Sequence, residues 1–450
     1  MGPGKLIYLH EDTNVVGSHK QKERVSPARA WWTVAVIFLA GILANIDRAI
    51  LSLLIPAIQS DFAITDTQIG LLSGVAFAVF YSTLGMPIAR ASDRGSRRLI
   101  IACGVAVWSV ATAASGFATR FSHLFLARMG VGVGEAVLTP ATVSLIADLF
   151  PKEQRGFALG AVGAANYIGG GLALLLGSIA IAAAATLVPL WGITEPWKIV
   201  FLIVGLPGVL VALLMLTVAE PPRGHERDGE TGSWAELMAF LSARRWVLGC
   251  HFLGFSLEGA IAYAVAVWAP TFFVRNFQMT AAEAGLMLGP FLLVGGPLGG
   301  LIGGWLLQRW SKAGHDSAPM IAGLLGSAVV CLAVGLAPLM PTPLLSALFF
   351  GISFTFGPIA ALGAFAAIQL IAPARLRAQV VAIYYFVVTM ISIMGGASII
   401  AYFTDNVFHD PAAIGRSISL TALLLGPFCV LVLWLALAPY ARAAREAPAS

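Results

Sequence analysis

The chain has 450 residues, of which 58% are hydrophobic and only 11% charged, and its mean hydropathy is +0.87. A composition this apolar excludes an ordinary soluble protein and indicates a protein that crosses a membrane many times. The formal net charge of +5 does not require a nucleic-acid partner, because the basic residues gather on one side of the expected membrane.

Twelve apolar stretches are each long enough to cross a hydrocarbon core about 30 Å thick as a helix. They follow a polar segment, residues 1–29, which has no cleavable signal peptide and which we expect to be a cytoplasmic tail. The expected spans of the first half are residues 30–58, 68–91, 98–119, 122–149, 155–185 and 197–219. Those of the second half are residues 246–274, 282–309, 318–338, 343–371, 377–404 and 415–440. The pattern predicts an all-α membrane protein with twelve transmembrane helices.

A long polar stretch divides the chain into two halves. Residues 220–245 begin with EPPRGHERDGETGSWAEL, which is rich in proline, glycine and both signs of charge, and we expect them to form a cytoplasmic linker. Residues 30–219 and 246–440 would each form a six-helix bundle, and residues 441–450 a cytoplasmic C-terminal tail. GMPIARASDRGSRR follows the second span and GGPLGGLIGGWLLQRWSK ends the eighth, and this weak repeat predicts that the two bundles are pseudo-symmetric.

The lysines and arginines indicate which side of the membrane is cytoplasmic. If the N-terminus lies inside, the loops on the outer side hold only Arg120, Lys198, Arg275 and Arg416. Nearly all other basic residues then fall on the inner side, as is typical of cytoplasmic loops. We therefore expect both termini in the cytoplasm and the protein in the inner or plasma membrane of the cell.

Four ionisable residues lie in the middle of the first and fourth expected spans. Asp47 and Arg48 are adjacent in the first span, and Arg128 and Glu135 lie in the fourth. A charge at that depth costs on the order of 3 kcal/mol or more unless it faces a cavity or a partner, so these residues mark a path for an ion, a proton or a substrate. Arg128 precedes Glu135 by seven residues, so the two face the same way about 10 Å apart along the helix axis.

The loop after the second span, ARASDRGSRR, combines an acid with a dense cluster of arginines. Asp93 could bind a helix N-terminus or an arginine of another helix when the inner ends of the helices close together. Asp93, Arg94 and Arg98, with Arg155 at the exit of the fourth span, are therefore candidate gating residues. The alternative is that these charges only set the topology.

The same loop resembles the signature of the major facilitator superfamily between its second and third helices, with Ala89 and Ser96 in place of the usual glycines. ANIDRAILSLLIP in the first span and ARMGVGVGEAVLTPATVSLIADLFPKEQRG in the fourth resemble the spinster-like branch of that superfamily. The residues that carry this resemblance are Asp47, Arg48, Arg128, Gly134, Glu135, Ala136, Pro140, Asp148 and Arg155. The resemblance implies two six-helix bundles around a central cavity, phosphorylated lipids such as lysophospholipids or sphingoid phosphates as cargo, and proton coupling.

Two positions depart from the patterns of the superfamily. Gln308 stands where the first half has Asp93, so an equivalent latch in the second half would lack its charge. The fifth span, which contains GAVGAANYIGGG, lacks the Gly-Pro pair typical of drug–proton antiporters, and this disfavours drug efflux.

In the fold that the resemblance implies, the first and fourth helices both line the cavity, which would bring Asp47, Arg48, Arg128 and Glu135 within reach of one another. A buried carboxylate can bind and release a proton when a neighbouring arginine changes partner, so Asp47 and Glu135 are the candidates for proton coupling. Arg48 and Arg128 are candidates for substrate binding, because the guanidinium fork suits a phosphate or a carboxylate. The alternative is a permanent ion-pair network that only fixes helix packing.

Glu258, in the middle of the seventh span, is a further candidate for substrate binding. It would be a second proton or cation site, or else a neutral carboxyl held by a hydrogen bond. His251, near the inner end of the same span, is expected at the membrane interface. The cysteines are far apart, and the sequence contains no metal-binding or cofactor motif.

The sequence favours a secondary active transporter, proton-coupled and working by alternating access, for an amphipathic anionic lipid. A soluble organic anion, such as an aromatic or sugar acid, is the alternative cargo. A membrane enzyme or an ATP-driven pump is disfavoured because no nucleophile elbow, zinc motif or phosphate-binding loop is present, and the intramembrane charges disfavour a receptor that does not transport. The expected partners are membrane lipids, the anion and protons, and we expect the protein to act as a monomer.

Overall fold

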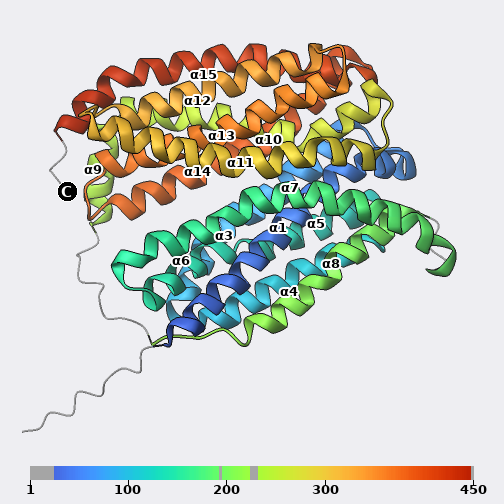
Figure 1. Cartoon of the computed structure of the whole chain (residues 1–450), viewed down its shortest axis with the longest axis horizontal. Coiled ribbons are helices and arrows are strands. Elements are labelled where there is room, and N and C mark those ends of the chain that lie inside the picture. Colours follow the sequence, from blue (N-terminus) through green and yellow to red (C-terminus); the bar gives the residue numbers. More distant parts are fainter. Residues whose placement is uncertain (1–24, 192–194, 223–231, 447–450) are drawn as a thin grey trace, which may run out of the picture.

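The computed structural model describes residues 25–191, 195–222 and 232–446. Within these ranges, twelve helical segments are long and apolar enough to cross a membrane. They run back and forth between two ends of the molecule: the end at which residues 220–245 connect the two halves, termed the linker side, and the opposite end, termed the far side. In Figure 1 the linker side is at the left, and the second half lies above the first. The expected linker and the two expected tails lie partly outside the described residues.

The first half contains six membrane-crossing units. They are α1 (Pro27–Phe62), α2 (Asp66–Gly70) continued by the π-helical turn η1 (Leu71–Val75) and α3 (Ala76–Arg94), α4 (Arg97–Ser115), α5 (Phe121–Glu135) followed by α6 (Leu138–Leu149), α7 (Lys152–Trp191) and α8 (Pro196–Met215). Local sequence sets several of the starts. Thr65 and Gln68 form a capping box for α2, and the Ser96 hydroxyl accepts a hydrogen bond from the Leu99 N–H at the start of α4.

The second half also contains six membrane-crossing units, preceded by a short linker-side helix, α9 (Trp234–Ala243). They are α10 (Arg245–Phe277), α11 (Ala281–Lys312), α12 (Ala318–Leu336) with the 3₁₀ turn η2 (Ala337–Leu339), α13 (Pro343–Ile371), α14 (Arg377–Tyr402) continued by the π-helical η3 (Phe403–Phe408), and α15 (Ile414–Arg445) after the 3₁₀ turn η4 (Pro411–Ala413). Thr280 and Glu283 form a capping box for α11.

The predicted all-α fold with twelve transmembrane helices is confirmed. Several helices extend beyond the expected spans, above all α7, which begins at Lys152 and continues to Trp191. The fourth span differs in another way. It is interrupted at Ala136 and Val137, so that Glu135 is the last residue of α5 and not an interior residue of one long helix.

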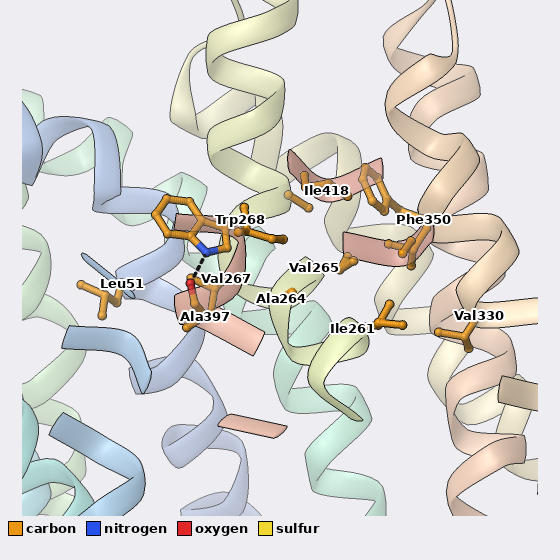
Figure 2. Packing of buried hydrophobic residues seen from close by; sticks show 14 of the residues in the cluster. Leu51, Ile261, Ala264, Val265, Val267, Trp268, Val330, Phe350, Ala397 and Ile418 are labelled. Carbon is orange, nitrogen blue, oxygen red and sulfur yellow. Dashed lines mark hydrogen bonds between the residues drawn. The ribbon is translucent and has the colours of Figure 1, made fainter. Parts of the chain in front are cut away.

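The interior of the second half is formed by apolar side chains of α10 and its neighbours (Figure 2). Trp268 of α10 is fully buried, and its indole N–H donates to the Ala397 carbonyl of α14 over 2.9 Å. A buried indole needs such a partner because an unpaired N–H in an apolar interior is costly. The bond joins α10 to α14, the helix of the second half that packs against α2 and η1 of the first half.

The two halves meet mainly where α7 packs against α11, where the α2–η1–α3 segment packs against α14, and where α1 packs against α10. Glycine permits the close approach at Gly171 of α7, where a Cβ atom would lie 2.5 Å from the backbone N of Leu293. At Gly70, a Cβ atom would lie 3.1 Å from the Ala397 carbonyl oxygen. Small residues at such crossings let helix backbones approach closely inside a membrane.

Candidate functional site

Glu135, at the end of α5, faces Arg48 of α1. Its Oε2 lies 2.9 Å from Arg48 Nε, and only 1% of the Glu135 side chain is exposed, against 31% of the Arg48 side chain. The Arg48 N–H does not point at the carboxylate, so Arg48 Nε and both Glu135 oxygens lack a hydrogen bond to any described residue. The pair is therefore a charge contact between one sealed group and one accessible group.

Arg128 and Asp47 form the deeper part of the cluster. Both are nearly fully buried, and Arg128 Nη1 donates to the backbone carbonyl of Asp47 over 3.3 Å and not to its carboxylate. Thr112 of α4 lies beside the Asp47 carboxylate, but its hydroxyl makes no hydrogen bond with a described residue. The structure thus brings the four predicted residues together, with several of their polar atoms unsatisfied. Buried charges in that condition are costly, and they are retained mainly at functional sites.

Phe77 of α3 is shared by the two arginines. The guanidinium carbons of Arg48 and Arg128 lie 5.6 and 6.0 Å from the centre of its ring, which is itself fully buried and stacked on Tyr81. Cation–π contact of this kind holds an arginine without neutralising it. Phe77 could not be recognised from the sequence, because one phenylalanine among many in the apolar spans carries no signal.

Tyr263 of α10 brings a polar group of the second half close to this cluster. Its hydroxyl donates to the Ser73 carbonyl in the π-helical turn η1 over 2.9 Å, and the charges of Arg48, Arg128 and Glu135 act on it. A π-helical turn displaces a carbonyl from the regular helical ladder and is often found at functional sites. This tyrosine, which the sequence analysis also missed, joins the two halves at the depth of the cluster.

On the far side of the molecule, a group of polar residues that we term the far-side clasp bridges the two halves: Gln59, Asp66 and Thr67 of the first half with Arg275 and Asp405 of the second. Arg275 donates from both terminal nitrogens to Asp66 over 2.7 Å, and one of them also to Gln59 over 2.8 Å. The Thr67 backbone N–H and hydroxyl donate to Asp405 over 2.6 and 2.7 Å. Bidentate arginine–carboxylate pairs combine strength with fixed geometry. In the sequence, Arg275 is distinguished only as a rare basic residue on the expected outer side.

The predicted gating residues lie at the linker-side ends of their helices. The side chain of Asp93 lies outside the part that the structure describes, and Arg94 is exposed. The Arg98 guanidinium donates to the Leu216 and Val218 carbonyls over 3.3 and 3.4 Å, and Arg155 Nε to the Phe150 carbonyl over 3.0 Å. Arg98 and Arg155 therefore bind groups of their own half in this conformation.

Arg97, which in the sequence is only one basic residue among many, is buried at the start of α4 on the linker side. It pairs with Asp148 at the end of α6, and its Nε donates to Glu220 over 2.9 Å. Burial opposes ionisation of Glu220, but hydrogen bonds from the Arg98 backbone N–H and from the Arg97 and Ser96 side chains outweigh it and hold the pKa of this carboxyl below its ordinary value. The charge network holds Glu220 and Pro221, which follow α8, against the rest of the first half.

Glu258 and His251 lie along α10 in the second half. Glu258 is 7% exposed and forms no hydrogen bond or ion pair with a described residue. His251 is buried and not interfacial as expected, because α13 packs over it and its Nε2 lies 3.0 Å from the Ala364 carbonyl oxygen. Glu258 is thus a separate feature of the second half, apart from the Arg48–Glu135 cluster.

Comparison with known proteins places these features in context. The model of the Major Facilitator Superfamily matches residues 37–397. An MFS-type efflux pump of Mycolicibacterium smegmatis is 28% identical over 431 residues, which cover 93% of this chain and 95% of that protein. Human protein spinster homolog 1 is 31% identical over 328 residues, which cover 68% of this chain and 60% of that protein, so the chain spans less than two thirds of this relative's length.

A solved structure resembles this one over nearly its whole length. It is a bacterial homologue of the human lysosomal transporter Spinster in an inward-facing and unoccupied conformation, with a TM-score of 0.77 and 26% sequence identity. The match covers 94% of this chain and 98% of the other.

Proposed function

Because the chain belongs to the major facilitator superfamily, and within it to the spinster-like branch, and is therefore a multi-pass membrane transporter, we propose that it couples protons to the transport of an amphipathic anion. A single-chain phospholipid or sphingoid phosphate is the proposed cargo. The proposed location is the inner or plasma membrane, with both termini in the cytoplasm and the monomer as the working unit.

The observation that carries this proposal is the contact between sealed Glu135 and accessible Arg48. A proton that binds Glu135 removes the negative charge that faces Arg48, and the guanidinium can then bind an anion from the cavity. Loss of the proton from Glu135 restores the Arg48–Glu135 pair and weakens the binding of the anion to Arg48. Anion and proton thus bind together and cross in the same direction. Arg128, which is more deeply buried than Arg48, provides a second positive charge for the anion. Asp47 provides a second, more deeply buried proton site.

Closure of the far side supports alternating access between the two halves, residues 30–219 and 246–440. The far-side clasp is formed, and the similar bacterial homologue was solved facing inward, so we infer that the cavity opens on the linker side. In the opposite state the clasp would separate and the linker-side ends would meet. We propose that Asp93, Arg94, Arg98 and Arg155 then serve as the gate by contacting the second half.

The proposal is tested with purified protein in liposomes that contain a labelled single-chain phospholipid substrate on one side only. We expect an imposed proton gradient to drive accumulation of the lipid, and Glu135→Gln to abolish that accumulation while the protein still binds the lipid. Glu283→Gln, at an exposed position on the far side, is the matched control and should transport normally. Gradient-driven accumulation that persists in Glu135→Gln would refute the coupling role of Glu135.

A soluble acid is the competing cargo, since a guanidinium fork binds either head group. The same liposomes loaded with an aromatic or sugar acid distinguish the two. Accumulation of the acid without accumulation of the lipid would replace the lipid assignment and keep the coupling mechanism.

A further inference from the structure

The junction between α9, α10 and the end of α15 lies at the linker-side end of the second half (Figure 1). α9 ends at Ala243, and only Arg244 separates it from α10, which begins at Arg245. α10 is one of the helical segments that are long and apolar enough to cross a membrane. In a membrane protein its first turn lies where the chain enters the bilayer, at the level of the lipid head groups.

An ion pair brings the end of α15 against this junction. Arg244 Nη2 donates to Glu446 Oε2 over 2.8 Å. Arg245 follows Arg244 directly, and Arg442 precedes Glu446 by about one helical turn. Arg245 and Arg442 are exposed, and neither guanidinium forms a hydrogen bond or an ion pair with a described residue. Two positive charges beside the ion pair therefore lack a counter-charge in the described part of the chain.

The nearby carboxylates offset only part of the positive charge. Arg445, in the last turn of α15, has its Nε 3.6 Å from Oδ2 of Asp316, in the loop between α11 and α12, and both side chains are exposed. Glu236 lies near the other end of α9, where its carboxylate accepts a hydrogen bond from the Ser233 N–H. The carboxylates of Glu446 and Asp316 thus face four arginines that we term the arginine patch: Arg244, Arg245, Arg442 and Arg445.

Exposed apolar side chains flank the arginine patch. Trp246, in the first turn of α10, is 61% exposed, and Trp234, at the start of α9, is 69% exposed. Met238 is also exposed and follows Trp234 by four residues, so the two share one face of α9, whereas Leu237 is buried in the apolar core. An apolar helix face bordered by basic residues is typical of helices at a membrane surface, where tryptophan is also enriched.

The start of α9 is fixed to the second half as well. The Gly232 N–H donates to the Arg375 carbonyl over 3.2 Å, and Gln379 Nε2 donates to the Gly232 carbonyl over 3.0 Å. α9 therefore presents its exposed face as an ordered part of the second half. Arginines at the ends of spans also set topology, but that role needs positive charge alone and leaves the exposed tryptophans beside the patch without a purpose.

We propose that the arginine patch, with Trp234 and Trp246, binds an anionic phospholipid of the linker-side leaflet. The guanidinium groups bind the phosphate, and the tryptophans pack against the apolar part of the lipid next to its head group. A soluble anion would use the arginines and leave the tryptophans in water, so the combination favours a lipid. This lipid lies outside the central cluster and is not the cargo, so the site does not depend on the proposed function.

The test measures which lipid the protein retains. The full chain is purified from vesicles that contain equal amounts of phosphatidylglycerol and phosphatidylcholine, and its bound lipids are counted by native mass spectrometry. We expect phosphatidylglycerol to exceed phosphatidylcholine by about tenfold, and the excess to fall at high salt, because two uncompensated arginines attract an anionic head group and salt screens that attraction.

Matched variants locate the bound lipid. Arg245→Gln combined with Arg442→Gln should remove most of the preference, whereas Arg245→Lys combined with Arg442→Lys should keep it, because the charge is retained. Arg309→Gln combined with Lys312→Gln is the control, because it removes the same charge from the linker-side end of α11. All of these side chains except that of Arg309, which lies over the Trp305 ring, make no contact that folding requires.

Several outcomes would overturn the site. Equal retention of the two lipids by the native protein, or a preference that survives the paired glutamine substitutions of Arg245 and Arg442, contradicts it. An equal loss of preference in the α11 control would show that the lipid follows total charge. Loss of the preference in Arg48→Ala would place the lipid in the central cluster. A dimer of the native protein without retained lipid would assign the arginine patch to a second copy of the chain.

Discussion

At the scale of single residues, the two arginines of the cluster differ in access and therefore in role. Arg48 has 31% of its side chain exposed, whereas Arg128 is 2% exposed and already donates to a backbone carbonyl. In the proposed mechanism a ligand would therefore meet Arg48 first, and would reach Arg128 only if the local packing loosened. Replacement of Arg48 should therefore lower the affinity for an anionic ligand more directly than replacement of Arg128.

We expect Arg48→Ala to weaken binding of an anionic single-chain lipid by about tenfold or more, because a hydrogen bond to a charged group contributes about 1.5–3 kcal/mol. Arg48→Lys should recover part of the affinity, since it keeps the charge and loses the fork. Affinity is measured by thermal stabilisation of the purified protein at several ligand concentrations.

The control for this prediction is a neutral lipid of the same chain length that lacks the phosphate. Arg416→Ala, at an exposed position on the far side, provides the control for a generic loss of positive charge. If Arg48→Ala reduced the affinity for the neutral lipid as much as for the anionic one, Arg48 would not contact the head group.

The sequence could predict the cluster of Asp47, Arg48, Arg128 and Glu135 because ionisable residues inside apolar spans are rare and conspicuous. It could not predict which of them pair, because pairing depends on the rotation of α1 against α5. It missed Phe77 and Tyr263 for a different reason: aromatic residues are common in apolar spans, so only their position in space sets them apart. The same holds for Glu258, whose lack of a partner is a fact of packing.

At the scale of helices, the number and type of elements followed from hydropathy, whereas their irregularities did not. Residues 343–371 were predicted as a span and form α13 with the same limits. The break after Glu135 and the π-helical turn η1 lie in segments whose composition is that of any apolar helix. Both irregularities adjoin the cluster, where tertiary contacts such as Tyr263 to Ser73 set the backbone geometry.

The contact of α7 with α11 gives a test at this scale. We expect Gly171→Ala to push the two helices apart, because the added Cβ would lie 2.5 Å from Leu293 backbone and side-chain atoms. Overpacking of this kind costs about 1–3 kcal/mol, so the melting temperature of the purified protein should fall. Gly300→Ala on α11 is the matched control, because its added Cβ would meet nothing within 4 Å. Equal melting temperatures for the two variants would mean that the crossing tolerates separation.

At the scale of the whole molecule, the far-side clasp would distinguish this conformation from the proposed state that is open on the far side. Its charged pair, Arg275 with Asp66, is bidentate, and the Asp66 side chain is 2% exposed. A buried carboxylate without its arginine raises the free energy of the conformation that buries it. The clasp therefore stabilises the closed far side only while both Arg275 and Asp66 are present. The balance between the two states of the transporter should respond to either residue.

We therefore expect Asp66→Asn to shift the protein toward the state that is open on the far side. Spin labels on exposed Ser122 and Asn406, one in each half, should report a longer far-side distance in the variant than in the native protein. Arg416→Ala serves as the control, because its pair with Asp410 lies within the second half. An unchanged distance distribution in Asp66→Asn would show that helix packing alone keeps the far side closed.

The attachment of the linker at both ends sets a limit on how far the halves can part. The Pro221 carbonyl accepts a hydrogen bond from Arg97 of the first half, and Gly232 exchanges hydrogen bonds with Arg375 and Gln379 of the second. Ten residues lie between these two points, and the eleven Cα–Cα steps that join them span at most about 40 Å when fully extended. The contour length of this segment therefore limits how far Pro221 and Gly232 can move apart. In the proposed cycle, opening on the linker side could separate these two residues only up to that length.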